Sequence, residues 1–126
     1  MKTGNYDIKD LTEVLYNAMK GVSKNIFAQT RPKVHEQMKD FVVVSFPNRI
    51  YDNIGTGNTN CVIELYARDT AAGINMSKLS SMQESVYEKL PIDSDICTVY
   101  RPVPVNTGAD GLGFHSLFIY CKVTIK

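Results

Sequence analysis

Apolar residues recur at intervals of three and four near the start of the chain, which is the pattern of an amphipathic helix. The stripe consists of Ile8, Leu11, Leu15, Ala18 and Val22. Asp7 is a plausible N-cap, and Gly21 can end the helix because glycine adopts a left-handed conformation readily. A second stripe at the same spacing follows later in the chain, at Met76, Leu79, Met82, Val86 and Leu90. Pro91 helps to end this second predicted helix.

Strict alternation of apolar and polar positions marks the strands. Residues 61–68, CVIELYAR, place Cys61, Ile63, Leu65 and Ala67 on one apolar face, which we expect to face the core. The final stretch, residues 115–125, alternates over a greater length, and its odd-numbered positions are mostly apolar. On its other face, Phe118 and Tyr120 add aromatic surface.

Shorter β-rich runs precede and separate these segments. They are NIFAQT at 25–30, DFVVVSFP at 40–47 and DICTVYRPVPV at 95–105. Pro102 and Pro104 cannot donate ladder hydrogen bonds, so the last run either ends at Arg101 or continues along a sheet edge. The runs at 52–60 and 106–113 are rich in Gly, Asn and Thr, which predicts two loops.

The order of these elements predicts an α+β fold. We expect a single mixed or antiparallel sheet of four to five strands, with two helices packed on one face. A length of 126 residues is typical of one domain, here residues 1–126.

Charge and hydropathy limit the classes of partner. The net charge is +1, so no overall field favours nucleic acid or an anionic membrane, and we expect no nucleic-acid sequence recognition. No apolar run approaches the ~20 residues that span a bilayer, and the first residues lack a signal-peptide core.

One segment, residues 20–39, is locally basic. Five basic side chains stand against Glu36 alone, which gives 5 − 1 = +4; they are Lys20, Lys24, Arg31, Lys33 and Lys39. The segment is a weak surface for an acidic partner or, as we prefer, a solvated loop. The basic residues are spread out, and Phe27 alone is aromatic among them, too little to stack successive bases.

The residues that commonly carry chemistry form no motif. The 3 cysteines, Cys61, Cys97 and Cys121, lie far apart in apolar stretches, which favours reduced packing residues. His115 and Cys121 share a strand face at six residues' separation, roughly 20 Å, which is too far for proton transfer or a shared metal. We therefore expect no catalytic residue, no cofactor and no metal.

Arg68 and Asp69 stand where the strand at 61–68 leads into the second helix. No histidine, cysteine or lysine lies beside them in the sequence. We interpret the joint as a plain turn, with a subunit contact as the alternative.

The strand VIELYARD, the Gly-containing turn and the helix MSKLSSMQESVYEKLP together resemble the central strand and second helix of tail-terminator, or tail-completion, proteins of long-tailed phages and prophages. The opening helix DLTEVLYNAMK, the strand FVVVSFPNRIY and the long closing strand follow in a similar order. The resemblance covers most of the chain as a pattern of elements, with little exact sequence. The long FHSLFIYCKVTIK end and the basic segment depart from it.

This resemblance implies a structural role rather than an enzyme. Such proteins form a ring, often a hexamer, that caps the tail tube and meets the head. It implies self-association, tail-tube and head–tail connector partners, no membrane, and a location in the host cytoplasm during assembly and then in the virion tail. As candidate interface residues we take Arg68, Asp69, Ile54, Val105 and Leu112. The alternative is a small cytoplasmic enzyme or ligand-binding domain whose site is assembled only in space.

Overall fold

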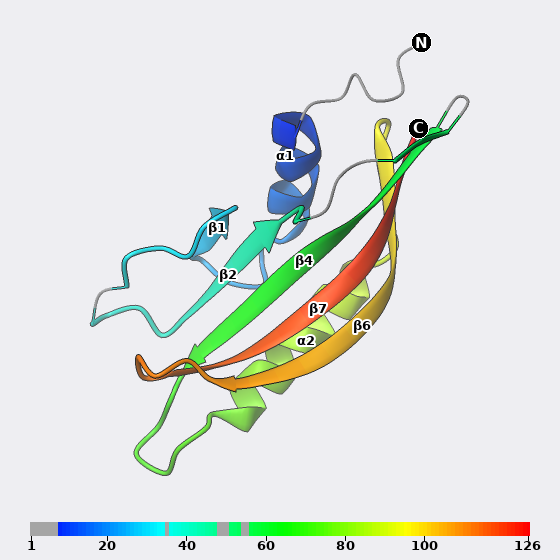
Figure 1. Ribbon diagram of the computed structural model, residues 1–126. Helices are drawn as coiled ribbons and strands as arrows, with labels where there is room; N and C mark the ends of the chain where they lie inside the picture. Colours follow the sequence, from blue (N-terminus) through cyan, green and yellow to red (C-terminus); the bar gives the residue numbers. More distant parts are fainter. Residues whose placement is uncertain (1–7, 35, 48–50, 54–55) are drawn as a thin grey trace.

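The computed structural model describes residues 8–34, 36–47, 51–53 and 56–126 of the chain (Figure 1). Two helices and seven strands follow one another within these residues. They are α1 (Ile8–Ala18), β1 (Ile26–Ala28), β2 (Asp40–Ser45), β3 (Tyr51–Asn53), β4 (Thr56–Arg68), α2 (Met76–Lys89), β5 (Ile92–Asp93), β6 (Cys97–Ala109) and β7 (Phe114–Ile125). The expected α+β class is therefore confirmed.

The strands form one curled sheet in the order β1-β2-β4-β7-β6-β5, with β3 paired to the beginning of β4. β1 runs parallel to β2 and every other pairing is antiparallel, so the sheet is mixed. The sequence-based expectation of four to five strands was too low. Very short strands such as β5, with 2 residues, carry almost no periodic signal.

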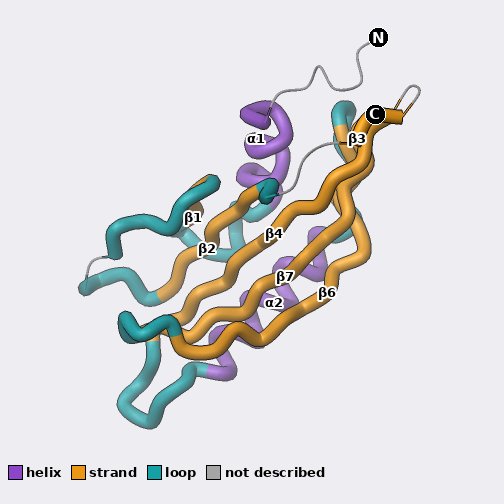
Figure 2. The backbone as a smooth tube through the Cα atoms, in the orientation of Figure 1, coloured by secondary structure: helices purple, strands orange, loops and turns teal. Residues whose placement is uncertain are grey.

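Both helices pack on the same face of the sheet (Figures 1 and 2). Leu11 and Leu15 of α1 and Met82 and Val86 of α2 are buried against it. The sheet contributes inward-pointing residues from four strands: Val42, Val44, Cys61, Ile63, Leu65, Ala67, Cys97, Val99, Ile119, Cys121, Val123 and Ile125. The apolar faces expected at 61–67 and 119–125 are thus core faces, because alternation along a strand sends every second side chain to the helices.

The buried stripe of α2 starts one turn later than the sequence pattern predicted. Asn75 caps the helix, and its side chain accepts a hydrogen bond from the Lys78 backbone N–H at 3.2 Å. Met76 is 68% exposed, so it does not belong to the buried stripe, which starts at Leu79.

A second apolar cluster covers part of the opposite face, which we call the open face. Its buried members come from β2, β4, β7 and the segment before β2; they are Met38, Phe41, Val43, Tyr66 and Phe114. Phe41 and Tyr66 stack with ring centroids 4.3 Å apart, and Phe118 of β7 packs beside them. The aromatic surface expected from Phe118 and Tyr120 therefore lies on the open face.

The two predicted loops are largely strands. Residues 56–60 begin β4, and residues 106–109 end β6, where they pair with β7. The content of Gly, Asn and Thr predicted loops. These residues nevertheless adopt strand conformation here, because their backbone groups are paired with neighbouring strands. Residues 54–55 of the first segment lie outside the described residues. In the second segment, residues 110–113 form the turn, so removing 107–112 would take paired residues out of the β6–β7 ladder, contrary to the expectation of a loop there.

β6 continues past Pro102 and Pro104 along an edge of the sheet and does not end at Arg101. This is one of the two alternatives that the sequence left open. Its register against β7 shifts between Tyr100 and Val103, and Arg101 in between has a φ of 55°. A residue in this left-handed region bends the strand and leaves an irregularity in the ladder. Pro102 and Pro104, which cannot donate ladder hydrogen bonds, are tolerated here because they follow this irregularity on an outer strand.

Cys61 should act as a packing residue, because it is fully buried opposite Cys121 in the β4–β7 ladder. We expect Cys61→Ala to lower the free energy of unfolding by about 1 kcal/mol, since loss of the sulfur leaves a small cavity. Urea denaturation under reducing conditions measures this, with the exposed Ser81→Ala as a control of negligible effect. Zinc that copurifies with the wild type and is lost from Cys61→Ala would contradict a purely structural role.

Candidate functional site

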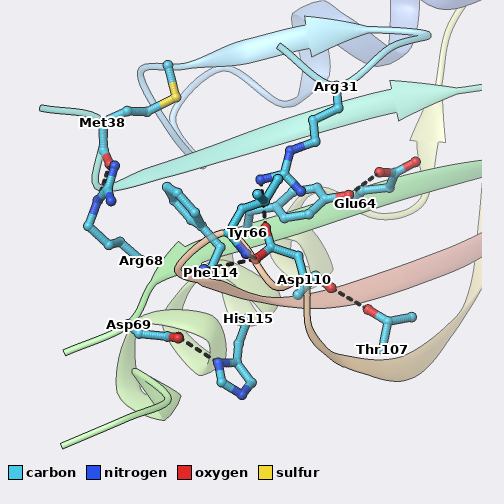
Figure 3. Close-up of polar contacts among 12 residues, drawn as sticks. Arg31, Met38, Glu64, Tyr66, Arg68, Asp69, Thr107, Asp110, Phe114 and His115 are labelled. Atoms are coloured by element: carbon cyan, nitrogen blue, oxygen red, sulfur yellow. Dashed lines mark hydrogen bonds and ion pairs between the residues drawn. The ribbon is translucent and has the colours of Figure 1, made fainter. Parts of the chain in front are cut away.

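The strap, residues 29–34, follows β1 and lies over the open face, where it carries Arg31 into the aromatic cluster (Figure 3). The guanidinium carbon of Arg31 lies 5.0 Å from the ring centroid of Tyr66, 5.4 Å from that of Phe41 and 6.0 Å from that of Phe114. A guanidinium at these distances over aromatic faces makes cation–π contacts. We call Arg31, these three rings and Asp110 the open-face cluster.

Asp110 completes this cluster from the β6–β7 turn. Its Oδ2 lies 2.6 Å from an Arg31 guanidinium nitrogen, and the two side chains are 9% and 26% exposed. Its Oδ1 accepts hydrogen bonds from the backbone N–H groups of Leu112 at 2.7 Å and Phe114 at 3.1 Å. Burial alone would raise the pKa of Asp110, but these two N–H groups and the Arg31 guanidinium outweigh it and hold the pKa below its usual value.

The interpretation of residues 20–39 as a solvated loop is therefore wrong at Arg31. The sequence places one aromatic residue, Phe27, among the basic ones, but the fold brings three rings from other elements to Arg31. The sequence offered no local signal for this contact. Arg31 and Asp110 lie far apart in the sequence, and the pairing of β2, β4 and β7 places their segments side by side.

Tyr66 is held in its neutral form within the same cluster. Its hydroxyl donates a hydrogen bond to a Glu64 carboxylate oxygen at 2.7 Å. Burial is the main cause that raises the pKa of Tyr66, and the hydrogen bond to Glu64 and the charge of Glu64 add to it. Tyr66 can therefore stack and donate, but it cannot serve as a base near neutral pH.

Arg68 and Asp69 point to different sides of the sheet (Figure 3), so the fold does not bring them together as one site. Arg68 lies on the open face, where its Nε donates to the Met38 backbone carbonyl at 2.9 Å and its guanidinium lies 4.5 Å from the Phe114 ring centroid. This contact arises because Arg68 is paired with Phe114 in the β4–β7 ladder.

Asp69 pairs with a histidine that the sequence did not place beside it. Its Oδ1 lies 2.5 Å from Nδ1 of His115, and both side chains are partly exposed. The register that sets Ala67 opposite His115 brings the two together. Such a pair can orient the imidazole ring and can exchange a proton with a bound molecule. Within the described residues, no hydroxyl or thiol hydrogen-bonds to His115.

Of the remaining candidate interface residues, Val105 and Leu112 are exposed, and Ile54 lies outside the described residues. Val105 is 42% exposed on β6, and Leu112 is 67% exposed at the β6–β7 turn. Beside Leu112, an open hollow of about 490 Å³ lies between the strap and Arg68. Lys33 and Glu36 also line this hollow, so it presents both a positive and a negative side chain to an approaching chain.

The described residues contain no cluster of His, Cys, Asp and Glu that could hold a metal ion. Cys61 and Cys97 are both poor candidates for thiolate chemistry. The hydrogen bond to Cys121, then burial, raise the pKa of Cys61, and burial raises the pKa of Cys97. Of the helices described, neither is long and apolar enough to cross a membrane.

Asp110→Asn should lower the free energy of unfolding by about 2 kcal/mol at pH 7, because Arg31 loses its charged partner in a mostly buried position. The lowered pKa of Asp110 means that its contribution is complete above the unfolded-state pKa of about 3.9 and is lost as pH falls through the lower folded-state value. Urea denaturation across this range should therefore show wild type and variant converging in acid.

The matched control is Asp95→Asn, at an exposed carboxylate that should contribute little. A difference between Asp110→Asn and wild type that stays constant from neutral pH into acid would contradict the proposed ion pair.

Comparison with known proteins gives a fold but no family. No family model and no curated protein sequence matches the chain. Among solved structures, 27 chains match. One, whose name is only a sequence identifier, aligns with 92% of this chain and 90% of its own at a TM-score of 0.58 and 8% identity. At this identity, the similarity shows that the fold occurs in another protein.

Proposed function

We propose that this chain is a structural protein of a phage or prophage tail, similar to tail terminators, that assembles into a ring. The observation that carries the proposal is the unpaired outer edge of β6. β5 pairs only with Val99 and Thr98, so from Tyr100 to Ala109 the described residues offer no strand partner on that side. A long exposed edge is a ready surface for strand addition by another chain.

Apolar side chains accompany this edge on the open face. Val103 is 56% exposed, Val105 is 42% exposed and Tyr120 of the neighbouring β7 is 41% exposed. Val103 is paired with Tyr120, and Val105 with Phe118, so these residues form one continuous patch. A second copy that covered the patch would remove apolar surface from water while it paired the β6 backbone.

The two edges of the sheet differ, which suits a head-to-tail ring. β1 forms the opposite edge with only 3 residues, whereas the β6 edge is long and bent. Contact between unlike edges is heterologous, and a heterologous contact closes into a ring when its rotation allows. Arg68 and Asp69 are already engaged within the chain, so Val105 is the stronger candidate for the subunit contact.

The β6–β7 turn gives the ring a second surface. Leu112 projects there at 67% exposure, while Asp110 anchors the turn through Arg31. A rigid turn with an exposed apolar tip suits contact with a tail-tube or head–tail connector protein. These partners, and a location in the host cytoplasm and then the virion tail, belong to the same proposal.

One observation favours the alternative, a small enzyme or ligand-binding domain. The partly exposed Asp69–His115 pair is capable of acid–base chemistry. The edge and its patch support the structural role more directly, because they involve ten consecutive residues rather than one pair.

Self-association should be visible by light scattering at high protein concentration, where we expect species larger than a monomer. Val105→Lys should shift these species toward monomer, because a charge on an edge strand opposes pairing and burial. Met76→Lys is the matched control, since it makes the same kind of change at an exposed position on α2. Wild-type protein that stays monomeric would rule out a preformed ring, and unchanged association of Val105→Lys would rule out this edge.

A further inference from the structure

A hollow of about 970 Å³ opens beside the end of α1, on a different part of the molecule from the β6 edge. Four lysines and one aspartate line it, a local charge of 4 − 1 = +3. The lysines are Lys20, Lys24, Lys39 and Lys78. Three of them come from the basic segment that the sequence singled out, and Lys78 joins them from α2. We call this feature the lysine hollow.

The walls of the lysine hollow are held in place by hydrogen bonds. The Asp40 carboxylate, 14% exposed, accepts a hydrogen bond from the Ser23 hydroxyl and lies 3.1 Å from the Lys78 amine. Asn25 donates through its side chain to the Asp40 backbone carbonyl at 3.0 Å, and its own N–H donates to Ser23 Oγ at 3.0 Å. The α1–β1 connection is thereby tied to the start of β2, and a ligand would meet a preformed surface.

The backbone at the rim brings a further positive charge. Gly21 has a φ of 98°, the left-handed conformation that turns the chain sharply after α1. The Lys89 amine lies 3.6 Å from the point where a Cβ at this glycine would stand. Lys89 at the end of α2 therefore adds to the positive potential at the rim.

We propose that the lysine hollow binds an acidic peptide segment of a partner protein. Carboxylates spaced along a peptide can reach separate lysines while avoiding Asp40, whereas the phosphates of a nucleic acid follow one another without interruption. Among the described residues that line the hollow, Tyr16 alone is aromatic, which gives bases little to stack on. Half-buried Ile26 adds apolar surface for side chains between the carboxylates.

This inference does not depend on the proposed ring, because the hollow and the β6 edge share no residue. It also gives a role to the lysines of the basic segment, and it needs no contribution from the net charge of the whole chain, which is only +1. Complementary charge at such a site chiefly fixes the choice of partner and the rate of encounter.

The test uses fluorescence anisotropy with a labelled ten-residue peptide rich in glutamate, at low ionic strength, where exposed charges are least screened. Replacing both Lys24 and Lys39 by alanine should weaken binding by roughly three- to twentyfold, as expected for two exposed charge pairs. The double replacement of Lys24 and Lys39 by arginine, which keeps the charge, should bind like wild type.

The matched control replaces Lys33 and Lys122 by alanine, an equal change of net charge at exposed lysines outside the hollow, and should bind like wild type. The proposal is overturned if this control weakens binding as much as the pair in the hollow. It is also overturned if a glutamine version of the peptide binds equally well, or if a single-stranded oligonucleotide of equal charge binds more tightly than the peptide.

Discussion

The antiparallel pairing of β4 with β7 is the constraint on which the other features depend. It runs without a register shift from Gly57 opposite Ile125 to Arg68 opposite Phe114. Because side chains alternate, this one register assigns every residue of both strands to the helices or to the open face. It sets Cys61 against Cys121 in the core. A slip by one residue would send the apolar positions to the open face and would dismantle both apolar clusters.

The open-face cluster is a consequence of that pairing, and it joins two segments that belong to no strand, the strap and the β6–β7 turn. Arg31 lies over rings carried by β2, β4 and β7, and Asp110 of the β6–β7 turn pairs with it. The contact connects the strap to the β6–β7 turn, two segments with no ladder between them. A charged pair suits this place because each group has hydrogen-bond or ring partners that compensate for lost hydration.

Periodicity predicted the elements whose side chains alternate regularly, and it failed where tertiary contacts decide. The core face of Cys61, Ile63, Leu65 and Ala67 follows from spacing alone, as do the two helices. Residues 106–109 read as a loop because Asn, Thr and Gly are typical of turns, and pairing with β7 overrode that preference. The meeting of Arg31 with Asp110, and of Asp69 with His115, could not be predicted because each joins segments distant in the sequence.

Unpaired backbone and exposed apolar or charged side chains lie at the periphery of the sheet, apart from the central strands that hold the fold together. At the centre, the β4 and β7 backbones are paired on both sides and their core faces are covered. At the periphery, no strand among the described residues pairs with the outer side of β6 beside exposed Val103 and Val105, and the lysine hollow keeps a local excess of positive charge. The apolar edge and the cationic hollow differ in chemistry and share no residue, so the contact proposed at one does not use the residues of the other. The proposed self-association and the proposed peptide binding therefore rest on separate parts of the fold.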